Sequence, residues 1–147
     1  MKTETLVVAI GNDHTAYEFK LPIIEYLTTA GYEILDLGAN NCEPVDYPDF
    51  GQAVGQALID KKANFGIVIC GTGIGISIAA NRIHGVRCAL CYEEETVRMA
   101  RLHNDANVLA MGARIIASHK AVELVKVFLT TKTSTQTRHK VRIKKLN

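Results

Sequence analysis

The sequence contains no apolar run approaching the roughly 18 residues that a membrane-spanning helix requires. Residues 1–6 include Lys2 and Glu4 and lead directly into a strand-like run, so we expect no signal peptide. Proline and glycine are few, with 3 and 11 residues among 147, while about 48% of the residues are hydrophobic. These proportions exclude a disordered, collagen-like or low-complexity chain. The length instead predicts one globular domain with one core and no membrane association.

Acidic side chains are absent from the last 16 residues, 132–147, which carry six lysines or arginines. The first 131 residues hold 11 basic and 15 acidic side chains, a formal charge of −4, although the whole chain stands at +2. An acidic body excludes a domain whose whole surface coats nucleic acid. The basic tail by itself leaves two interpretations open, an arm that binds nucleic acid and a segment that only adds solubility.

The four cysteines have no secretory signal beside them, which predicts reduced thiols in the cytoplasm. Cys88 and Cys91 have the C-x-x-C spacing of many metal and redox sites, but their segment is apolar and strand-like. Residues three apart on a strand face opposite sides, so we interpret both as small core residues. Neither a second cysteine pair nor a suitably spaced histidine pair accompanies them, and we expect no metal.

Short apolar runs alternate with longer amphipathic stretches along the chain. Runs typical of buried parallel strands cover residues 5–10, 33–37, 65–70, 86–91 and 108–111. Helical spacing of apolar residues follows them in 19–30, 50–58, 77–81, 93–102 and 119–129. This alternation predicts an α/β fold, a single Rossmann-like three-layer domain with a five-stranded parallel sheet and helices on both faces.

Ligands of such sheets bind outside the carboxyl ends of the strands. The residues that follow the predicted strands therefore form the candidate site, and they are Asp13 and His14, residues 70–75, Tyr92, and residues 112–114.

Residues 70–77, Cys-Gly-Thr-Gly-Ile-Gly-Ile-Ser, form the most informative segment. Three glycines at alternate positions let the backbone turn tightly and bring successive N–H groups toward one point. The helix that follows directs its positive end to the same place. Such a loop binds an anion.

Three known kinds of anion-binding loop fit this segment poorly. In a dinucleotide loop, G-x-G-x-x-G, the third glycine comes one residue later than here, and the loop usually follows the first strand. Glu93 does lie at a suitable distance along the chain for the acidic residue of that motif. A thiol phosphatase needs arginine where this chain has Ile76, and a nucleoside-triphosphate loop needs a lysine that is absent. In a fourth interpretation the anion forms during a reaction. Cys70, biased toward thiolate beside the helix N-terminus, abstracts a proton next to a carbonyl, and the loop amides stabilise the oxyanion.

Two histidine-containing segments supply candidate acids, bases and hydroxyl-binding groups. Asp13 and His14 follow the first strand, and His103 and Asn104 follow the helix predicted at 93–102. We expect both histidines to lie in loops at one edge of the sheet. Arg114, just past the fifth strand, is a candidate anion ligand.

Five segments, taken in order, match those of one enzyme family. They are Asp13-His14, Asp46-Tyr47-Pro48, residues 70–81 (Cys-Gly-Thr-Gly-Ile-Gly-Ile-Ser-Ile-Ala-Ala-Asn), residues 103–109, and Arg138-His139 with Arg142 in the tail. Together they closely resemble type B ribose-5-phosphate isomerase. The resemblance spans essentially the whole chain, and the block at 70–81 is highly specific. The broader family includes allose-6-phosphate isomerases and the subunits of galactose-6-phosphate isomerase.

The resemblance implies an aldose–ketose isomerase of the non-oxidative pentose phosphate pathway, which interconverts D-ribose 5-phosphate and D-ribulose 5-phosphate through a cis-enediolate. Cys70 would be the base that moves a proton between C1 and C2, and His103 would open the furanose ring. The groups that would hold the enediolate, with no metal or cofactor, are Thr72 and the amides of Gly71, Gly73, Ile74 and Gly75. Sugar hydroxyls would be held by Asp13, Tyr47 and Asn104. The phosphate would be bound by His14, Arg114, Arg138 and Arg142.

The resemblance also implies a homodimer or a dimer of dimers, with the site between two subunits and the tail of residues 132–147 crossing to the neighbour. Arg138 and Arg142 are four apart and would share one face of a helical tail, which suits a small phosphate dianion better than a nucleic acid. The chain keeps the full set of catalytic positions, which favours a self-sufficient homo-oligomer. It departs from its relatives at Ala16, where they commonly have glycine.

Three alternatives remain open from the sequence. The substrate could be a six-carbon sugar phosphate such as allose 6-phosphate or galactose 6-phosphate. The chain could bind a sugar phosphate without catalysis. It could also be a nucleotide-binding module of the flavodoxin type, which would bind FMN or NAD.

Overall fold

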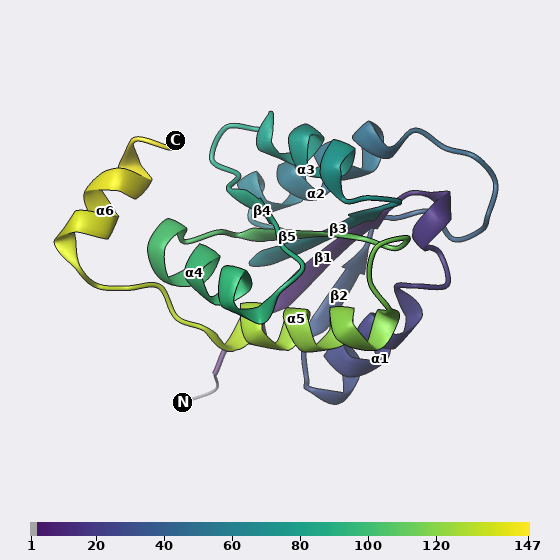
Figure 1. Ribbon diagram of the computed structural model, residues 1–147, viewed down its shortest axis with the longest axis horizontal. Coiled ribbons are helices and arrows are strands. Elements are labelled where there is room, and N and C mark those ends of the chain that lie inside the picture. The colour runs from purple at the N-terminus through teal and green to yellow at the C-terminus, as the bar shows by residue number, and fades with distance from the viewer. Residues whose placement is uncertain (1–2) are drawn as a thin grey trace.

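The computed structural model describes residues 3–147 and contains a five-stranded sheet in which all neighbouring strands are parallel (Figure 1). The spatial order of the strands is β2-β1-β3-β5-β4. Their bounds are β1 (Val7–Asn12), β2 (Glu33–Asp36), β3 (Phe65–Cys70), β4 (Cys88–Leu90) and β5 (Val108–Gly112). The central strands β1, β3 and β5 are almost wholly buried, which is why they form continuous apolar runs. The predicted parallel α/β fold is confirmed.

Helices cover both faces of the sheet. The helices are α1 (Leu21–Thr29), α2 (Tyr47–Ile59), α3 (Ile74–Asn81), α4 (Glu94–Asn104) and α5 (Ser118–Thr130), with α6 (Thr137–Lys144) in the tail. In Figure 1, α2 and α3 lie above the sheet, and α1, α4 and α5 lie below it. Successive side chains of β1 point to opposite faces of the sheet. Val8 and Ile10 belong to the cluster of buried side chains below the sheet, and Ala9 belongs to the cluster above it.

Several elements differ in extent from the sequence prediction, and α3 and β4 show the physical reasons. Helix α3 begins at Ile74, three residues before the predicted start, because Gly73 adopts a left-handed conformation (φ +79°) and starts the helix directly after the loop. Strand β4 has three residues where six were predicted. The backbone N–H of Arg87 donates to the side chain of Asn107 at 2.8 Å and not to a neighbouring strand, so the ladder begins only at Cys88.

The C-x-x-C cysteines lie on opposite sides of the sheet, as predicted. Cys88 packs with the cluster under α2 and α3, and Cys91 belongs to the cluster on the other face. Burial raises the pKa of both thiols, which keeps them protonated at neutral pH. Both therefore act as small core residues.

The strand order places a crevice at the carboxyl ends of β1 and β3. From β1 the chain passes to β2 on one side and then returns to β3 on the other, so the two connections leave the sheet in opposite directions. This is the switch point at which open parallel sheets bind ligands. Within residues 3–147 no helix is long and apolar enough to cross a membrane.

Candidate functional site

A cavity of about 540 Å³ opens at this switch point. Its lining residues come from the ends of β1, β3 and β5 and from the starts of α2 and α3, and they are Asp13, His14, Thr15, Tyr47, Cys70, Gly71, Thr72, Ile74, Gly75, Ile78 and Arg114. Nine of these are residues that the sequence predicts for the site. The carboxyl ends of three strands, well separated in sequence, therefore meet around one cavity.

Cys70 is the last residue of β3 and is only 3% exposed. The backbone N–H of Gly73 donates a hydrogen bond to its sulfur at 3.1 Å. Glycine is required at position 73, because a Cβ there would lie 2.7 Å from the carbonyl carbon of Met111 and the backbone is left-handed. The loop thus turns tightly against β5, and this turn places the Gly73 N–H within hydrogen-bonding distance of the Cys70 sulfur.

The N-terminal turn of α3 continues from the loop beside Cys70. The N–H of Ile74 donates to the hydroxyl oxygen of Thr72 at 3.2 Å, while Gly71 and Gly75 line the cavity. A side chain at Gly75 would collide with Tyr47, since its Cβ would lie 2.7 Å from the Tyr47 hydroxyl. The missing side chain therefore brings the phenol of Tyr47 against the start of the helix, whose positive end favours an anion.

Asp13 and His14 are held in defined orientations at the end of β1. The Asp13 carboxylate accepts hydrogen bonds from the backbone N–H of Thr15 at 3.0 Å and from its hydroxyl at 2.6 Å, and so caps a short 3-10 helix, η1 (His14–Ala16). The Nδ1 atom of His14 accepts the N–H of Val45 at 3.1 Å. This bond leaves the other ring nitrogen, Nε2, to carry the proton as a donor.

Arg114 supplies a cation to the cavity. Its guanidinium lies against the loop, with Nη1 3.4 Å from where a Cβ of Gly71 would stand. The cavity thus combines a thiol with the Gly73 amide bonded to it, the N-terminus of α3, a histidine donor and a guanidinium, which suits an oxyanion next to a phosphate. Within residues 3–147, no group of three or more histidine, cysteine, aspartate or glutamate side chains could hold a metal ion.

Four predicted site residues lie elsewhere in the chain: His103, Asn104, Arg138 and Arg142. Helix α4 runs back along the sheet, so its last turn, with His103, reaches the amino ends of the strands. At about 3.3 Å per residue, the five residues of β5 separate that edge from Cys70 by about 15 Å. The expectation that His14 and His103 share one edge of the sheet is wrong, because a helix between parallel strands returns the chain to the opposite edge.

Helix α6 carries the two tail arginines next to His103. The rings of His103 and His139 stack with their centroids 4.4 Å apart and an angle of 9° between their planes. Burial lowers the pKa of His139, and the positive charges of His103, Arg138 and Arg142 lower it further. Figure 1 shows α6 at the far left, beyond α4 and away from the carboxyl ends of β1 and β3 at the right. His103, Asn104, Arg138, His139 and Arg142 form a second group, which we call the tail cluster.

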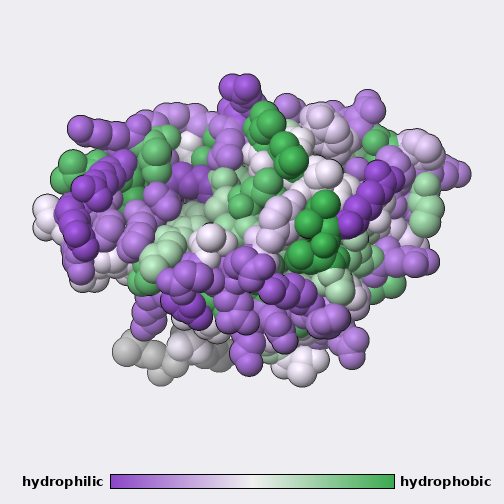
Figure 2. Space-filling view, viewed as in Figure 1, coloured by the Kyte–Doolittle hydropathy of each residue, from purple (hydrophilic) through white to green (hydrophobic). Residues whose placement is uncertain are grey.

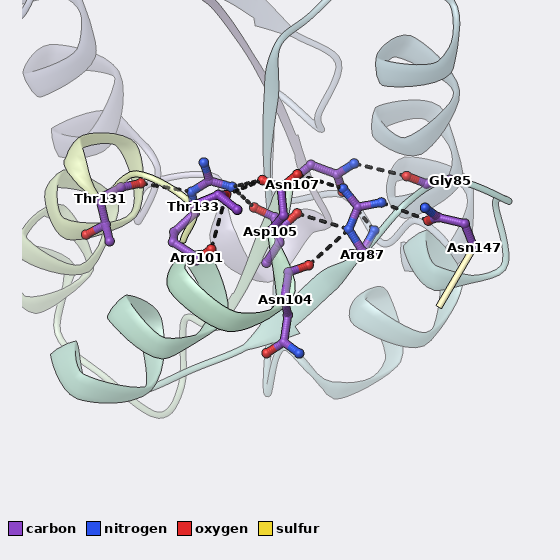
Figure 3. A network of polar contacts seen from close by, with 10 residues as sticks. Gly85, Arg87, Arg101, Asn104, Asp105, Asn107, Thr131, Thr133 and Asn147 are labelled. Carbon is purple, nitrogen blue, oxygen red and sulfur yellow. Dashed lines mark hydrogen bonds and ion pairs between the residues drawn. The ribbon is translucent and has the colours of Figure 1, made fainter. Parts of the chain in front are cut away.

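A partly buried polar network joins the end of α4 to the tail (Figure 3). Asp105, at the left-handed end of α4, accepts hydrogen bonds from Arg101 at 2.9 Å, from the Thr133 hydroxyl at 2.6 Å and from Arg87 at 3.3 Å. Arg101 also donates to the carbonyl of Thr131 at 3.2 Å. Because these partners come from α4, from the start of β4 and from the tail, the network sets the position of the tail cluster.

Asp105→Asn is expected to lower the free energy of unfolding by about 2 kcal/mol. Asparagine tolerates the left-handed backbone at this position but removes the charge that the buried guanidinium of Arg101 requires. Asp60→Asn is the matched control, because the exposed Asp60 only accepts a bond from Gln56 on the surface of α2. Its expected cost is below about 0.5 kcal/mol. Urea denaturation of both variants measures the difference, and equal losses would contradict the assigned role of Asp105.

Sequence reasoning missed two residues of the cavity, Thr15 and Ile78, and it named Tyr92 as a candidate without predicting its contact. Thr15 fixes the Asp13 carboxylate, Ile78 forms part of the wall, and the Tyr92 hydroxyl donates to the carbonyl of Thr72. The spacing of Asp13 and Thr15 is a recognisable turn signal. Tyr92 stands out only by following a strand, and its partner depends on the tertiary fold.

The family model for ribose/galactose isomerases matches residues 8–146 of the chain. The solved structure of ribose-5-phosphate isomerase B from Clostridium thermocellum is 43% identical and superposes with a TM-score of 0.93 over 96% of this chain and 95% of that one. Ribose-5-phosphate isomerase B of Escherichia coli is 39% identical over 83% of this chain and 82% of its own length.

Galactose-6-phosphate isomerase subunit LacB of Clostridium acetobutylicum is 37% identical over 86% of this chain and 73% of its own length. The match to the family model and the similarity of the relatives extend over the strands, the glycine loop and the cavity together. The chain therefore belongs to the ribose/galactose isomerase family, and it shares its fold with the type B ribose-5-phosphate isomerases.

Proposed function

We propose that this chain interconverts D-ribose 5-phosphate and D-ribulose 5-phosphate through a cis-enediolate. One observation carries the proposal: the Cys70 sulfur lies in the ligand cavity at 3.1 Å from the Gly73 amide, at the start of a helix and beside Arg114. Relatives named as ribose-5-phosphate isomerases support it. Four free cysteines accord with a reducing compartment, and we place the reaction in the cytoplasm.

In the proposed reaction, the Cys70 thiolate takes the proton from C2 of the open-chain aldose. The electron pair of the broken C–H bond forms the C1–C2 double bond of the enediolate, and the carbonyl oxygen becomes the oxyanion. The Thr72 hydroxyl and the amides around Gly73 stabilise that charge, so the amide ring is the electrophile and no step requires a metal or cofactor. A proton passes from the C2 hydroxyl to the C1 oxygen, and Cys70 returns its own proton to C1, so that C2 becomes the carbonyl carbon of the ketose.

We assign the remaining groups by their chemistry. Asp13 and Tyr47 hold the sugar hydroxyls, and His14 and Arg114 bind the phosphate at the other end of the cavity. His14 suits this role because its Nε2 is a fixed donor, and Arg114 because its fork matches two phosphate oxygens.

The tail cluster acts in this proposal on the site of a second subunit. His103 would open the ring there, with Asn104 on a hydroxyl and with Arg138 and Arg142 on the phosphate. A second subunit is required because about 15 Å separate the two groups within one chain. A homodimer, or a dimer of such dimers, supplies two equivalent shared sites.

Exposed apolar side chains support this association. Ile74 and Ile78 on α3 are about half exposed beside the cavity, and Val141 and Leu146 are similarly exposed in the tail. Figure 2 shows hydrophobic residues gathered at the upper middle of the surface, over α3. Contact between α3 of one subunit and the tail of the other would cover both apolar surfaces and bring the tail cluster to the cavity.

The test is a kinetic comparison of the purified protein on ribose 5-phosphate and allose 6-phosphate. We expect kcat/KM to be at least about tenfold larger for the five-carbon substrate, since a sixth carbon displaces the phosphate from Arg114 or C2 from Cys70. The galactose-6-phosphate isomerase relative makes a six-carbon sugar the second candidate. A preference for allose 6-phosphate would support that candidate. Sugar-phosphate binding without proton exchange at C2 in heavy water would show a non-catalytic binding protein.

A further inference from the structure

Tyr92 and Cys70 are connected through a single peptide group. The Tyr92 hydroxyl donates a hydrogen bond to the carbonyl oxygen of Thr72. The N–H of the same peptide belongs to Gly73 and donates to the Cys70 sulfur at 3.1 Å. Tyr92 follows β4 and Cys70 ends β3, so the two side chains come from different parts of the sheet and hold opposite ends of one peptide plane.

This peptide needs an external contact to hold its orientation. Gly73 has no side chain and a positive φ, and a glycine at such a position lets the preceding peptide rotate with little steric cost. Strand β5 supports the back of the peptide, since a Cβ at Gly112 would lie 2.6 Å from the Thr72 carbonyl carbon. Close packing limits translation, while the hydrogen bond from Tyr92 opposes rotation of the carbonyl away from its present direction.

The orientation matters for the sulfur. If the peptide rotated, its N–H would leave Cys70 and a carbonyl oxygen would turn toward it, which would disfavour a thiolate. A hydrogen bond to the carbonyl also strengthens the N–H of the same peptide as a donor. Burial raises the pKa of Tyr92, as does the nearby Cys70, so the phenol keeps the proton that it donates.

We propose that Tyr92 is a positioning residue, which directs the Gly73 N–H at the Cys70 sulfur and so keeps the cysteine ready to act as a base. This role rests on the function proposed above for Cys70. It is not a contact with substrate, because the Tyr92 hydroxyl is bonded to the backbone of Thr72 and its side chain is not among the cavity residues.

Tyr92→Phe removes the hydroxyl and leaves the ring. We expect kcat for ribose 5-phosphate to fall about threefold to tenfold, as loss of one hydrogen bond predicts, with KM changed less than about twofold. Tyr32→Phe is the matched control, since Tyr32 lies before β2 at the opposite edge of the sheet, and its kcat should equal that of the wild type. An unchanged kcat in Tyr92→Phe, or a rise in KM that accounts for the loss, overturns the proposal.

A second measurement does not depend on the substrate. In a Cys42→Ser background, which removes the exposed cysteine, iodoacetamide labelling of Cys70 is followed by peptide mass mapping. Tyr92→Phe should slow the labelling at neutral pH about threefold or more, and the difference should vanish at alkaline pH, where the thiol ionises without help. Equal labelling at neutral pH overturns the role of Tyr92. Slower labelling in a protein that isomerises no sugar phosphate would retain that role and reject the proposed function.

Discussion

Cys70→Ala is expected to lower kcat for ribose 5-phosphate by at least about 10³-fold, the range that removal of a general base produces. Among the described residues that line the cavity, Asp13 is the only carboxylate and Cys70 the only thiol, and one oxygen of the Asp13 carboxylate accepts two bonds from Thr15. Because these bonds hold Asp13 as the cap of η1, we expect it not to take over the role of the sulfur. A coupled assay of ribulose 5-phosphate formation measures the loss.

Two controls separate lost chemistry from lost structure in the Cys70→Ala protein. It should still bind a phosphorylated sugar acid that mimics the enediolate, because the amides and Arg114 remain. Calorimetric titration with that compound gives the affinity, which we expect within about tenfold of the wild type. Cys42→Ser, a substitution of an exposed cysteine, should retain full activity. Substantial turnover by Cys70→Ala would remove Cys70 from the role of base.

A mixture of two inactive variants should recover activity if the site is shared between subunits. In the proposed dimer each site consists of the cavity of one subunit and the tail cluster of the other. Cys70→Ala inactivates the cavity of its own chain, and His103→Ala inactivates the tail cluster that its chain contributes to the partner's cavity. A mixed dimer then has one site with both defects and one site with none. With random pairing, half of the dimers are mixed, so we expect about a quarter of the wild-type activity. Co-expression of the two differently tagged chains and purification on both tags isolates the mixed dimer, which by itself should show about half of the wild-type activity.

The matched control for this mixture pairs Cys70→Ala with Arg114→Ala. Both residues line the same cavity, so each site of the mixed dimer keeps one cavity defect and the activity stays low. Recovery in this control would show that Cys70 and Arg114 of one chain do not serve the same site. An inactive mixed dimer of Cys70→Ala and His103→Ala would show that the tail cluster does not serve the partner's cavity.

Local patterns were sufficient to predict the sheet and the loop. The bounds of β3 agree with the apolar run at 65–70, because a strand buried on both faces leaves a continuous apolar signal. The length of the edge strand β4 was overestimated, because the strand can begin only after Arg87, whose N–H donates to the Asn107 side chain. The loop at 70–75 could be recognised because its glycines mark a tight turn, and the left-handed backbone at Gly73 favours glycine for a local reason.

Positions across the sheet could not be predicted in the same way. His103 was expected near His14, but α4 extends to Asn104 and ends at the opposite edge. Tyr92 carries no local mark of its bond to Thr72, since the two are 20 residues apart and meet only when β4 and β3 take their places on either side of β5. Contacts of this kind depend on strand order, which hydrophobic periodicity does not encode.

The sequence by itself determined the family, the parallel α/β fold and the half of the site that follows β1 and β3. Those features depend on short segments whose hydrogen-bonding and steric needs are met locally, and on the rule that strand ends meet at a switch point. Only the tertiary structure showed that the tail cluster lies about 15 Å from Cys70, that Asp105 is bonded to the tail, and that Tyr92 is bonded to the loop. The physical reason is that each of these depends on which elements are neighbours in space, and packing of the whole chain decides that.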